Sequence, residues 1–529
     1  MSDRLCQTRA MVHNLAEIAS RQAAARPDDV AFEEAYGDRR TLTWSELDAQ
    51  VDRFAAWLSG QGLVAGQRVA LVLENRLELP VAYLAVLRLG LVAVPVNPRG
   101  AHDEVLALCA QTGTRVVVAE RRWASTLTET GLRTVIAAPL RDEDVPAARP
   151  DAAVAFADAL AADGPALPPP PQDPESLAVL MSTSGTSTRP RIVMLSHRAL
   201  LANIVQVAAI RPQPIVAADR ILLVLPLFHV FALNGVLGQA LHQGATTVLL
   251  DRFDDQTLAE VARGAITVLP VAPPVVAAWC GRPGVAEALA GVRTVLSGAA
   301  PIEADLVEEF SATGGTTLHQ GYGLTEAAPV VTTTLAQTDP VPGSVGTPVE
   351  GLEVRLVDSD GSDAHPDDPG EIWLRGPNLL TGFWPDGTDG PDADGWFATG
   401  DVGIRAPDGS LVLVDRLREL VIVSGFNVYP REVEEVLAEA PGVAEVAVVG
   451  VGDPYTGEAV RAYVVPVVPD ADPEETAERL RAYAALRLAA FKVPRDIEVT
   501  DALPHTATGE ISKSRLRAAE ARRGIQGLL

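Results

Sequence analysis

The stretch Asp415–Glu435, which reads DRLRELVIVSGFNVYPREVEE, divides the chain and decides how the fold is interpreted. A charged segment, Asp415–Glu419, leads into a short apolar strand at Leu420–Val423, and a turn of two small residues, Ser424–Gly425, follows. Pro430 then opens a helix with an acidic first turn, because proline and glutamate are both favoured at helix N-termini. We therefore interpret this stretch as a joint between two units of the protein.

Length and composition limit the class of protein. A chain of 529 residues is too long for one hydrophobic core and indicates about three or four folding units. The 47% hydrophobic and 21% charged residues are typical of an ordinary globular protein, and the net charge of −26 argues against nucleic acid or an anionic membrane as the main partner. Together with the joint, this predicts a large N-terminal domain at residues 1–415 and a small C-terminal lid at residues 416–529.

The three cysteines, Cys6, Cys109 and Cys280, are far apart, so neither a disulfide framework nor a zinc site is expected. Met1–Ala10 has charged residues and no apolar run, which indicates a cytoplasmic protein without a signal peptide. Ile221–Leu241 contains no Asp, Glu, Lys or Arg and is long enough to span a bilayer. A proline and several polar residues interrupt it, so we expect a buried strand, a turn and a helix instead of a membrane span.

Strands alternate with helices through the first part of the chain, which predicts an α/β fold with two doubly wound parallel sheets. Pro165–Pro174 is expected to be an extended connection inside this unit. From Gly346 to Val414 short strands alternate with Gly, Asp and Pro turns, which predicts a small β-barrel. The part after the joint is predicted to be a mobile α+β lid. The helices expected are Thr43–Gln61, Pro80–Leu89 and Val105–Gln111, and the strands are Arg68–Leu73, Val92–Val96, Arg115–Ala119 and Leu177–Met181.

Four segments carry the chemical signal. Ser182–Arg191, STSGTSTRPR, follows an apolar strand and offers several O–H and N–H donors to phosphate, although an ordinary surface turn has the same composition. The others are Gly321–Glu326 (GYGLTE), Thr399–Asp401 (TGD) and the joint itself. In this order and at these distances they resemble the adenylate-forming superfamily of acyl-CoA synthetases, adenylation domains and luciferases. The resemblance extends from Leu15 to Arg517.

The resemblance implies a site for an acyl-adenylate. Tyr322 is similar to the ring that packs on adenine, Thr325 to a hydroxyl on the α-phosphate, and Asp401 to the acceptor of the ribose hydroxyls. Glu326 is similar to a Mg²⁺ carboxylate, since oxygen ligands suit a hard cation. The residues implied for the AMP moiety are Gly298, Ala299, Ala300, Gly321, Tyr322, Gly323, Thr325, Asp401 and Arg416.

The resemblance also implies a path for the thiol of CoA. His229, beside Phe228, resembles an aromatic gate, and His229 and Thr325 are the catalytic residues that the resemblance implies. A histidine in such an apolar segment is otherwise usually a core residue. Ser424, Gly425 and Phe426 are similar to the turn that lets pantetheine pass, and Arg418 lies at the hinge position. Lys492 and Arg495 are among basic residues that suit CoA or a carrier-protein pantetheine, and equally a solvated face.

The chain departs from the family pattern at two places. The family's phosphate loop reads TSGTTGxPKG, whereas here Thr188 and Ile192 replace glycines and Arg191 replaces the lysine. β-Branched residues fit badly where a backbone wraps phosphates. Near the C-terminus, Glu510 replaces the lysine that bridges the substrate carboxylate and the α-phosphate during adenylation. Removing one such donor commonly costs ~10²–10³ in rate. The loop residues concerned are Thr183, Ser184, Gly185, Thr186, Ser187, Thr188 and Arg191.

Both departures affect adenylation, whereas the implied contacts to AMP and CoA are kept. We hypothesise an acyl-CoA ligase specialised for the second half-reaction, acyl-adenylate plus CoA to acyl-CoA plus AMP, with a separate adenylating ligase as its supplier. This is similar to non-adenylating ligases that handle a bulky terpenoid acyl group. The alternatives are a complete ATP-dependent medium- or long-chain ligase using Lys513, and an inactive AMP-binding relative with a regulatory role. Use of ATP and Mg²⁺ depends on which holds. The hypothesis predicts a lid with Ser424–Gly425 facing the pocket.

Overall fold

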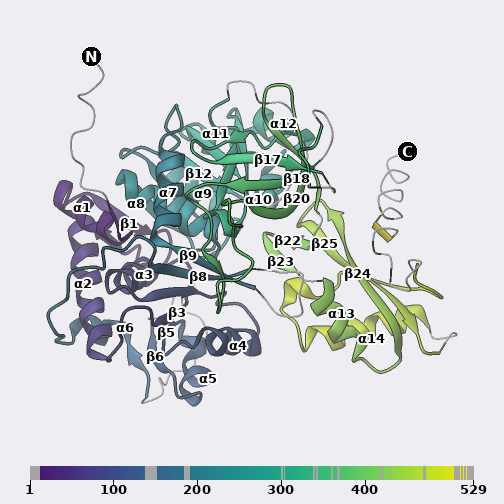
Figure 1. Ribbon diagram of the computed structural model, residues 1–529, viewed down its shortest axis with the longest axis horizontal. Helices are drawn as coiled ribbons and strands as arrows, with labels where there is room; N and C mark the ends of the chain where they lie inside the picture. The colour runs from purple at the N-terminus through teal and green to yellow at the C-terminus, as the bar shows by residue number, and fades with distance from the viewer. Residues whose placement is uncertain are drawn as a thin grey trace.

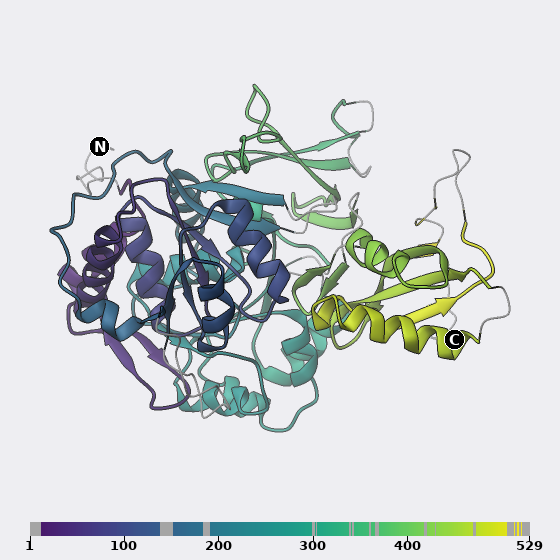
Figure 2. The same ribbon diagram turned by 90° about the horizontal axis from the view of Figure 1, so that it is seen from below.

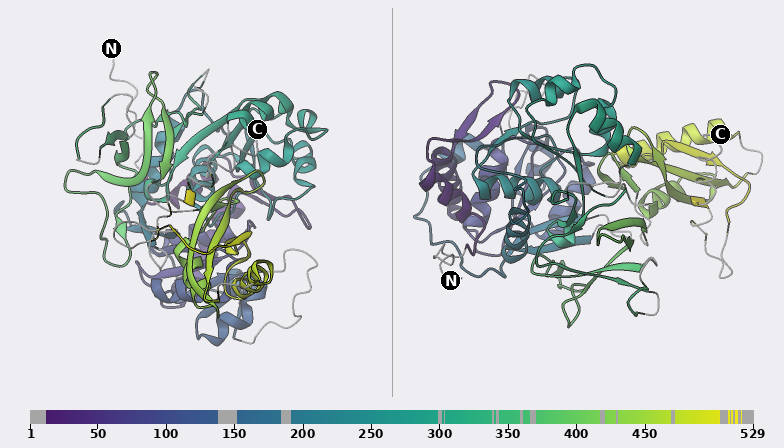
Figure 3. Two further views of the ribbon diagram at one scale, coloured as in Figure 1. Left: turned by 90° about the vertical axis from the view of Figure 1, so that its right-hand side faces the viewer. Right: turned by 90° about the horizontal axis from the view of Figure 1, so that it is seen from above.

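The structure is a computed structural model and describes residues 12–137, 152–183, 191–298, 302, 304–337, 340, 343–358, 361–365, 370–416, 421–428, 430–468, 472–504, 511, 513, 516–517 and 520. Two large sheets with flanking helices form the body (Figure 1). A smaller sheet lies along one side of the body, and the C-terminal part projects from one end (Figures 2 and 3). The predicted α/β fold with a large N-terminal and a small C-terminal part is confirmed.

The first large sheet has eight strands in the order β19-β9-β8-β4-β3-β5-β6-β7. Its pairs from β8 through β4, β3, β5 and β6 to β7 are parallel, whereas β9 is antiparallel to both β8 and β19. The strands are β3 (Arg68–Val72), β4 (Val92–Pro95), β5 (Val116–Ala119), β6 (Arg133–Ile136), β7 (Val154–Ala155), β8 (Leu177–Thr183), β9 (Arg191–Ser196) and β19 (Gly382–Phe383). The segment Pro165–Pro174 has no regular structure and connects α6 to β8, as predicted.

The second large sheet has nine strands in the order β16-β15-β14-β13-β12-β10-β11-β1-β2. Its central pairs, from β1 through β11, β10, β12 and β13 to β14, are parallel. The strands are β1 (Val30–Glu34), β2 (Thr41–Thr43), β10 (Arg220–Leu223), β11 (Thr246–Leu249), β12 (Val268–Val271), β13 (Thr294–Ser297), β14 (Leu318–Gly323), β15 (Val330–Thr333) and β16 (Thr347–Pro348).

Helices cover both sheets. Those of the body are α1 (Glu17–Ala25), α2 (Trp44–Gly60), α3 (Glu78–Arg88), α4 (His102–Thr112), α5 (Ala124–Glu129), α6 (Phe156–Ala161), α7 (His197–Ala208), α8 (Gln239–Gln243), α9 (Thr257–Arg263), α10 (Pro273–Trp279), α11 (Val285–Leu289) and α12 (Ala304–Gly314), with the short turns η1 (Arg121–Trp123) and η3 (Thr325–Ala327) and a π-helix, η2 (Phe231–Gly238). Thr43 begins α2 with a capping box completed by Glu46, which fixes its predicted start.

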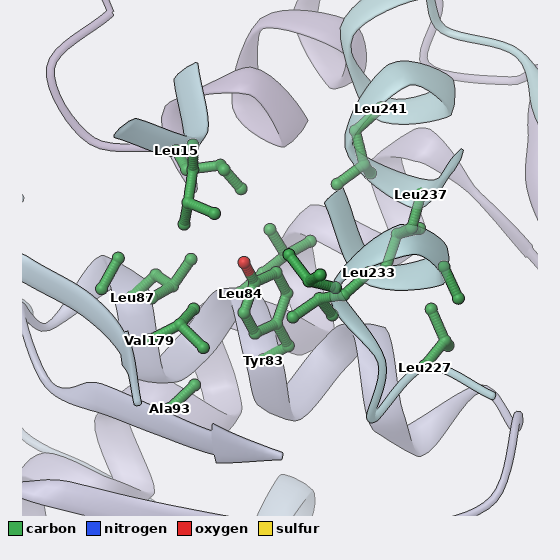
Figure 4. Close-up of a cluster of buried hydrophobic side chains, with 14 of the residues drawn as sticks. Leu15, Tyr83, Leu84, Leu87, Ala93, Val179, Leu227, Leu233, Leu237 and Leu241 are labelled. Carbon is green, nitrogen blue, oxygen red and sulfur yellow. The ribbon is translucent and has the colours of Figure 1, made fainter. Parts of the chain in front are cut away.

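One hydrophobic core joins the two large sheets (Figure 4). Tyr83, Leu84 and Leu87 of α3 pack with Leu233 and Leu237 of η2, and all are buried. The uncharged stretch read as a strand, a turn and a helix is therefore core, formed by β10, η2 and α8. Among the described residues no helix is long and apolar enough to cross a membrane.

The strands predicted between residues 346 and 414 form an antiparallel sheet in the order β17-β18-β20-β21. Their bounds are β17 (Glu353–Val357), β18 (Gly370–Arg375), β20 (Phe397–Arg405) and β21 (Leu411–Arg416). The described ladders do not join β17 to β21, so in this part of the chain the unit expected as a small barrel is a four-stranded sheet.

The C-terminal part is an α+β unit, as predicted. Its sheet runs β23-β22-β25-β24, with β26 on β25. Its elements are β22 (Val421–Val423), β23 (Phe426–Val428), α13 (Pro430–Ala438), β24 (Val443–Asp453), β25 (Gly457–Pro466), α14 (Pro473–Ala485), η4 (Ala490–Lys492) and β26 (Asp496–Val499). Strand β23 was not expected, because only four residues separate the Ser424–Gly425 turn from the start of α13.

Ser424 and Gly425 form the two-residue turn of the β22–β23 hairpin. Their φ angles are 51° and 80°, so both lie in the left-handed region. Val423 pairs with Phe426 across the turn. Two central residues with positive φ define a type I′ turn, in which glycine is preferred. The predicted small-residue turn is thus confirmed, and its conformation explains why small residues stand there.

Candidate active site

A cavity lies between the body and the β22–β23 hairpin, and its volume is about 1420 Å³ when the space at its opening to solvent is included. Segments far apart in the sequence line it, from β8, η2, β13, β14, η3, β15, β20 and the hairpin. The predicted site residues among its lining are Thr183, His229, Gly298, Gly321, Tyr322, Gly323, Thr325, Glu326, Asp401 and Gly425. The structure therefore brings together all four segments that the sequence singled out.

Tyr322 and Asp401 form one corner of the cavity. The Tyr322 hydroxyl donates a hydrogen bond of 2.6 Å to Asp401 Oδ2, which joins β14 to β20. The amide of Asp401 donates to Thr399 Oγ1, and that hydroxyl donates to the carbonyl of Ile372. Tyr322 thus holds the carboxylate of Asp401 and Thr399 holds its backbone, which fixes an acceptor at this corner of the cavity.

Gly321 and Gly323, on either side of Tyr322, are required by the neighbouring strand. A Cβ at Gly321 would lie 2.9 Å from the carbonyl oxygen of Thr332, and one at Gly323 would lie 2.4 Å from that of Pro329. Both contacts are closer than real Cβ atoms show. The close approach of β15 therefore accounts for these glycines without a ligand.

Arg416 pairs directly with Asp401 in the ladder between β20 and β21. This register places both residues at the same level of the sheet, as their expected shared role at a ribose requires. Only the backbone of Arg416 is among the described parts of the chain.

Thr325 and Glu326 lie in the short turn η3 and line the cavity, with Glu326 only 5% exposed. The described residues contain no group of three or more His, Cys, Asp or Glu able to hold a metal ion. A single carboxylate beside a hydroxyl fits Mg²⁺ of the kind that is held mainly by phosphate oxygens and water. Glu326 would hold such an ion, and the ion would neutralise phosphate charge.

His229 lies in an aromatic cluster at the inner end of the hairpin. Its ring centroid is 4.6 Å from that of Phe228 and 5.8 Å from that of Phe426. Phe426 in turn stacks on Phe491 of η4 at 4.5 Å. Loss of hydration lowers the pKa of His229 to about 4, so the imidazole is neutral at pH 7.

The hairpin presents its turn to the cavity. Gly425 and Ile422 both line the cavity, and the Ser424 amide donates to the carbonyl of Thr456, which ties the turn to β25's neighbouring loop. Phe426 follows directly and meets the His229 cluster. The orientation agrees with the prediction of a turn that faces the pocket.

Arg191 does not point freely into this cavity. Its guanidinium carbon lies 3.4 Å from the centroid of the Phe383 ring, and its Nη2 donates to Asp389 Oδ2 at 2.7 Å. Cation–π contact and a charge-assisted hydrogen bond both hold the side chain beside β19. The charge at the position of the family's loop lysine is thus already paired within the protein.

Ile192 corrects one expectation. It lies in strand β9 opposite Ser182 and is 4% exposed, within a hydrophobic cluster that includes Leu180. A β-branched side chain suits a buried strand. The expected poor fit of isoleucine at this position is therefore wrong, because the strand has already begun there.

Several expected site residues lie outside the described residues. They are Ala299, Ala300, Ser184, Gly185, Thr186, Ser187, Thr188, Arg418 and Glu510. Lys513 is described, and its Nζ pairs with Glu434 of α13 at 2.8 Å, on the C-terminal unit.

The structure adds residues that sequence reasoning missed. Phe231 and Gly235 of η2 line the cavity, and the Phe231 ring lies 3.1 Å from where a Cβ of Gly298 would be. Phe491 reaches the gate through Phe426. Phe231 and Gly235 both lie in the apolar run Ile221–Leu241, which was a sequence signal for them. No local sequence pattern marks Phe491, because its stacking partner Phe426 lies far away along the chain.

The chain matches the AMP-binding enzyme family over residues 19–384 and the C-terminal domain of AMP-binding enzymes over residues 432–510. The chain belongs to the AMP-binding enzyme family. A long-chain-fatty-acid–CoA ligase of Escherichia coli O157:H7 is 33% identical over 90% of both chains. A feruloyl-CoA synthase of an Amycolatopsis species is 36% identical, over 90% of this chain and 93% of that one.

Solved structures of the family agree with the fold. The amide bond synthetase McbA from Marinactinospora thermotolerans has a TM-score of 0.81 at 29% identity, covering 96% of this chain and 99% of its own. A double mutant of o-succinylbenzoate CoA synthetase from Bacillus subtilis, bound to a product analogue, has a TM-score of 0.80 at 26% identity, covering 95% and 98%. The predicted membership of the adenylate-forming superfamily is confirmed.

Proposed function

We propose that this protein is an acyl-CoA ligase specialised for thioester formation, in which CoA attacks an acyl-adenylate and AMP leaves. The observation that carries the proposal is that Gly425 of the hairpin lines the same cavity as His229, Tyr322 and Asp401, while the ring of the next residue, Phe426, packs against His229. A thiol entering beside the hairpin would reach an acyl group whose AMP is held at the other corner. Curated relatives named as acyl-CoA ligases support the same class of reaction.

The reaction needs little acid–base help from the protein. The CoA thiol gives its proton to water, its sulfur attacks the acyl carbonyl, the bond between the acyl carbon and the phosphate oxygen breaks, and AMP leaves with the electron pair. A phosphate whose second pKa is about 6 leaves without protonation at neutral pH. Because His229 has a pKa of about 4, we assign it to gating and orientation of the thiol instead of to storage of its proton.

Two features support the loss of adenylation. Arg191 is engaged by Asp389 and Phe383, and Glu510 stands in the sequence where the family has its bridging lysine. Like charges about 4 Å apart repel by roughly 4 kcal/mol at an effective dielectric near 20, so a glutamate would oppose an incoming carboxylate. The proposal therefore includes a separate adenylating ligase as supplier and a division into a body, residues 1–415, and a lid, residues 416–529.

The acyl group is proposed to be apolar and uncharged. The arm of the cavity beside η2 is lined by Val207, Ile210, Phe231, Leu296 and Val330. Among the described lining residues no lysine or arginine is present, so a second carboxylate on the acyl chain would be buried without a partner. Alkyl, aryl and terpenoid acyl groups fit this lining, and dicarboxylic ones do not.

The second candidate is a complete ATP-dependent acyl-CoA ligase. The comparisons favour it, because the curated relatives are whole acyl-CoA ligases at 33–36% identity across most of the chain. In this case Lys513 would leave Glu434 and enter the cavity when the lid turns.

The deciding experiment supplies purified protein with CoA and synthetic adenylates of fatty, aromatic and terpenoid acids, and runs ATP–pyrophosphate exchange with the same acids in parallel. We expect acyl-CoA and AMP from an adenylate without measurable exchange. Exchange in the absence of any second ligase would establish the complete enzyme. Absence of both products and exchange, with AMP still bound, would instead indicate an inactive regulatory relative.

A further inference from the structure

Lys492 is buried where the C-terminal unit meets the body. Its side chain is 9% exposed, and its Nζ donates to Glu432 Oε1 of α13 at 2.9 Å. The same Nζ pairs with Glu104 Oε1 of α4, a helix of the body. Lys492 thus links two units through charge, and the expectation that it lies on a solvated face or meets an anionic acceptor is not what the structure shows.

A buried lysine is stable only with partners, because loss of water around an ammonium group is costly. Burial alone would lower the pKa of Lys492, but the carboxylates of Glu432 and Glu104 raise it above its ordinary value. Lys492 therefore stays charged at neutral pH. Moving the C-terminal unit away from α4 would leave this charge with one carboxylate fewer.

Glu104 is fixed on its own side of the contact. It lies in the first turn of α4, and its Oε2 accepts from the Ala101 amide in the cap of that helix. Only Oε1 is used for Lys492. Because the helix cap fixes Oε2, it also fixes the position of Oε1, so the carboxylate that binds Lys492 is preorganised.

The ion pair is coupled to the cavity through the neighbouring residue. Phe491, next to Lys492 in η4, stacks on Phe426, and Phe426 meets both Phe228 and His229. Fixing η4 against α4 therefore fixes the hairpin against the gate. The contact between Phe426 and His229 is one of those that a turning lid would break.

We propose that the Glu104–Lys492 ion pair is a latch that holds the C-terminal unit with the Ser424–Gly425 turn and Phe426 at the gate formed by Phe228 and His229. Glu104 and Lys492 are positioning residues for thioester formation, acting through the hairpin without touching the substrate. The role in catalysis rests on the proposed function, whereas the latch itself does not.

The chain provides one matched control. Glu104→Gln removes the cross-unit charge but keeps an oxygen for the helix cap. Asp103→Asn makes the same change on the exposed neighbouring residue of α4. Glu432→Gln is not a control of this kind, because Glu432 contacts Glu104 as well as Lys492. A loss seen with the first variant alone would be specific to the cross-unit contact.

Lid position is measured by energy transfer between dyes at Val64→Cys and Leu486→Cys, both highly exposed, with Cys6 and Cys280 replaced by serine. Thioester formation is measured with synthetic adenylate and CoA. We expect Glu104→Gln to broaden or shift the energy-transfer distribution and to lower the maximal rate about tenfold, with little change in the KM for adenylate. Asp103→Asn should keep the wild-type distribution and rate.

Three outcomes would overturn the latch: an unchanged distribution in Glu104→Gln, an equal change in Asp103→Asn, or a slower reaction without any change in lid position. A changed distribution with an unchanged rate would refute the positioning role. If the wild-type protein formed no thioester, the proposed function would fail, and the energy-transfer measurement would still decide whether the latch exists.

Discussion

At the scale of single residues, the Tyr322–Asp401 hydrogen bond is the most informative contact of the site. It ties a strand of the nine-stranded sheet to the small antiparallel sheet, and it fixes the carboxylate that is expected to accept from ribose. Sequence motifs indicated both residues but not their bond, because the two lie on separate elements of the chain.

Two variants separate the ring from the carboxylate. Asp401→Ala should weaken AMP binding about 10- to 100-fold, since hydrogen bonds to a charged group contribute about 1.5–3 kcal/mol each. Tyr322→Phe keeps the ring and should weaken AMP binding less than about fivefold. Calorimetric titration with AMP measures both dissociation constants. Equal losses in the two variants would show that the carboxylate has no separate role.

The lowered pKa of His229 gives a prediction on pH. Its pKa in the folded protein is about 4, below the ordinary value of 6.5, so between these pH values the unfolded chain binds a proton that the folded protein does not. The free energy of unfolding should therefore decrease as pH falls from 6.5 to 4. In His229→Asn this decrease should be smaller, as measured by denaturant unfolding at pH 7 and pH 5. An identical pH dependence in both proteins would refute the shifted pKa.

At the scale of elements, strands β9 and β19 determine the state of the phosphate segment. Arg191 at the start of β9 lies over Phe383 of β19 and pairs with Asp389 beyond it. From the sequence, Ile192 is expected to fit badly in a phosphate loop. In the structure it lies in a regular part of β9, and its side chain is buried in the core. The significant departure is thus the capture of Arg191, which depends on a segment nearly two hundred residues away and has no local signal.

Asp389→Asn should loosen that capture. Because the pair is partly exposed, we expect only a modest effect, a rise of about twofold to fivefold in affinity for ATP, with thioester formation from adenylate unchanged. Thermal shift with ATP and with AMP measures the two affinities in parallel. A fall in the rate of thioester formation would show that Asp389 supports the second half-reaction directly.

The hairpin turn offers a test with a close control. Gly425→Ala and Gly409→Ala both place a side chain at a positive φ, 80° and 85°, with no atom within 4 Å of the added Cβ. Each should cost about 1–2 kcal/mol of stability from backbone strain alone. Only Gly425 lines the cavity, so only its variant should slow thioester formation while adenylate binding is kept. Equal rates in the two variants would exclude the turn from the thiol path.

At the scale of the whole molecule, the alternating pattern of strands and helices was enough to predict the layers of the body, because each element follows its own periodicity. The contacts between units were not predictable in the same way. The ion pair between Lys492 and Glu104 forms only when the C-terminal unit docks on the body, and Lys492 looks like an ordinary surface lysine in the sequence. The residue types along the chain were enough to predict the helices and strands. How the two units dock depends on charge partners that are far apart along the chain, such as Lys492 and Glu104.

In the proposed function, the body of the molecule holds an adenylate and the lid presents a thiol, with the chemistry of ATP left to another enzyme. The most direct measurement is the rate of acyl-CoA formation by one preparation from two starting points: acyl-adenylate with CoA, and free acid with ATP, Mg²⁺ and CoA. We predict turnover from the adenylate and a rate at least about 10²-fold lower from the free acid. Equal rates from both starting points would contradict this prediction.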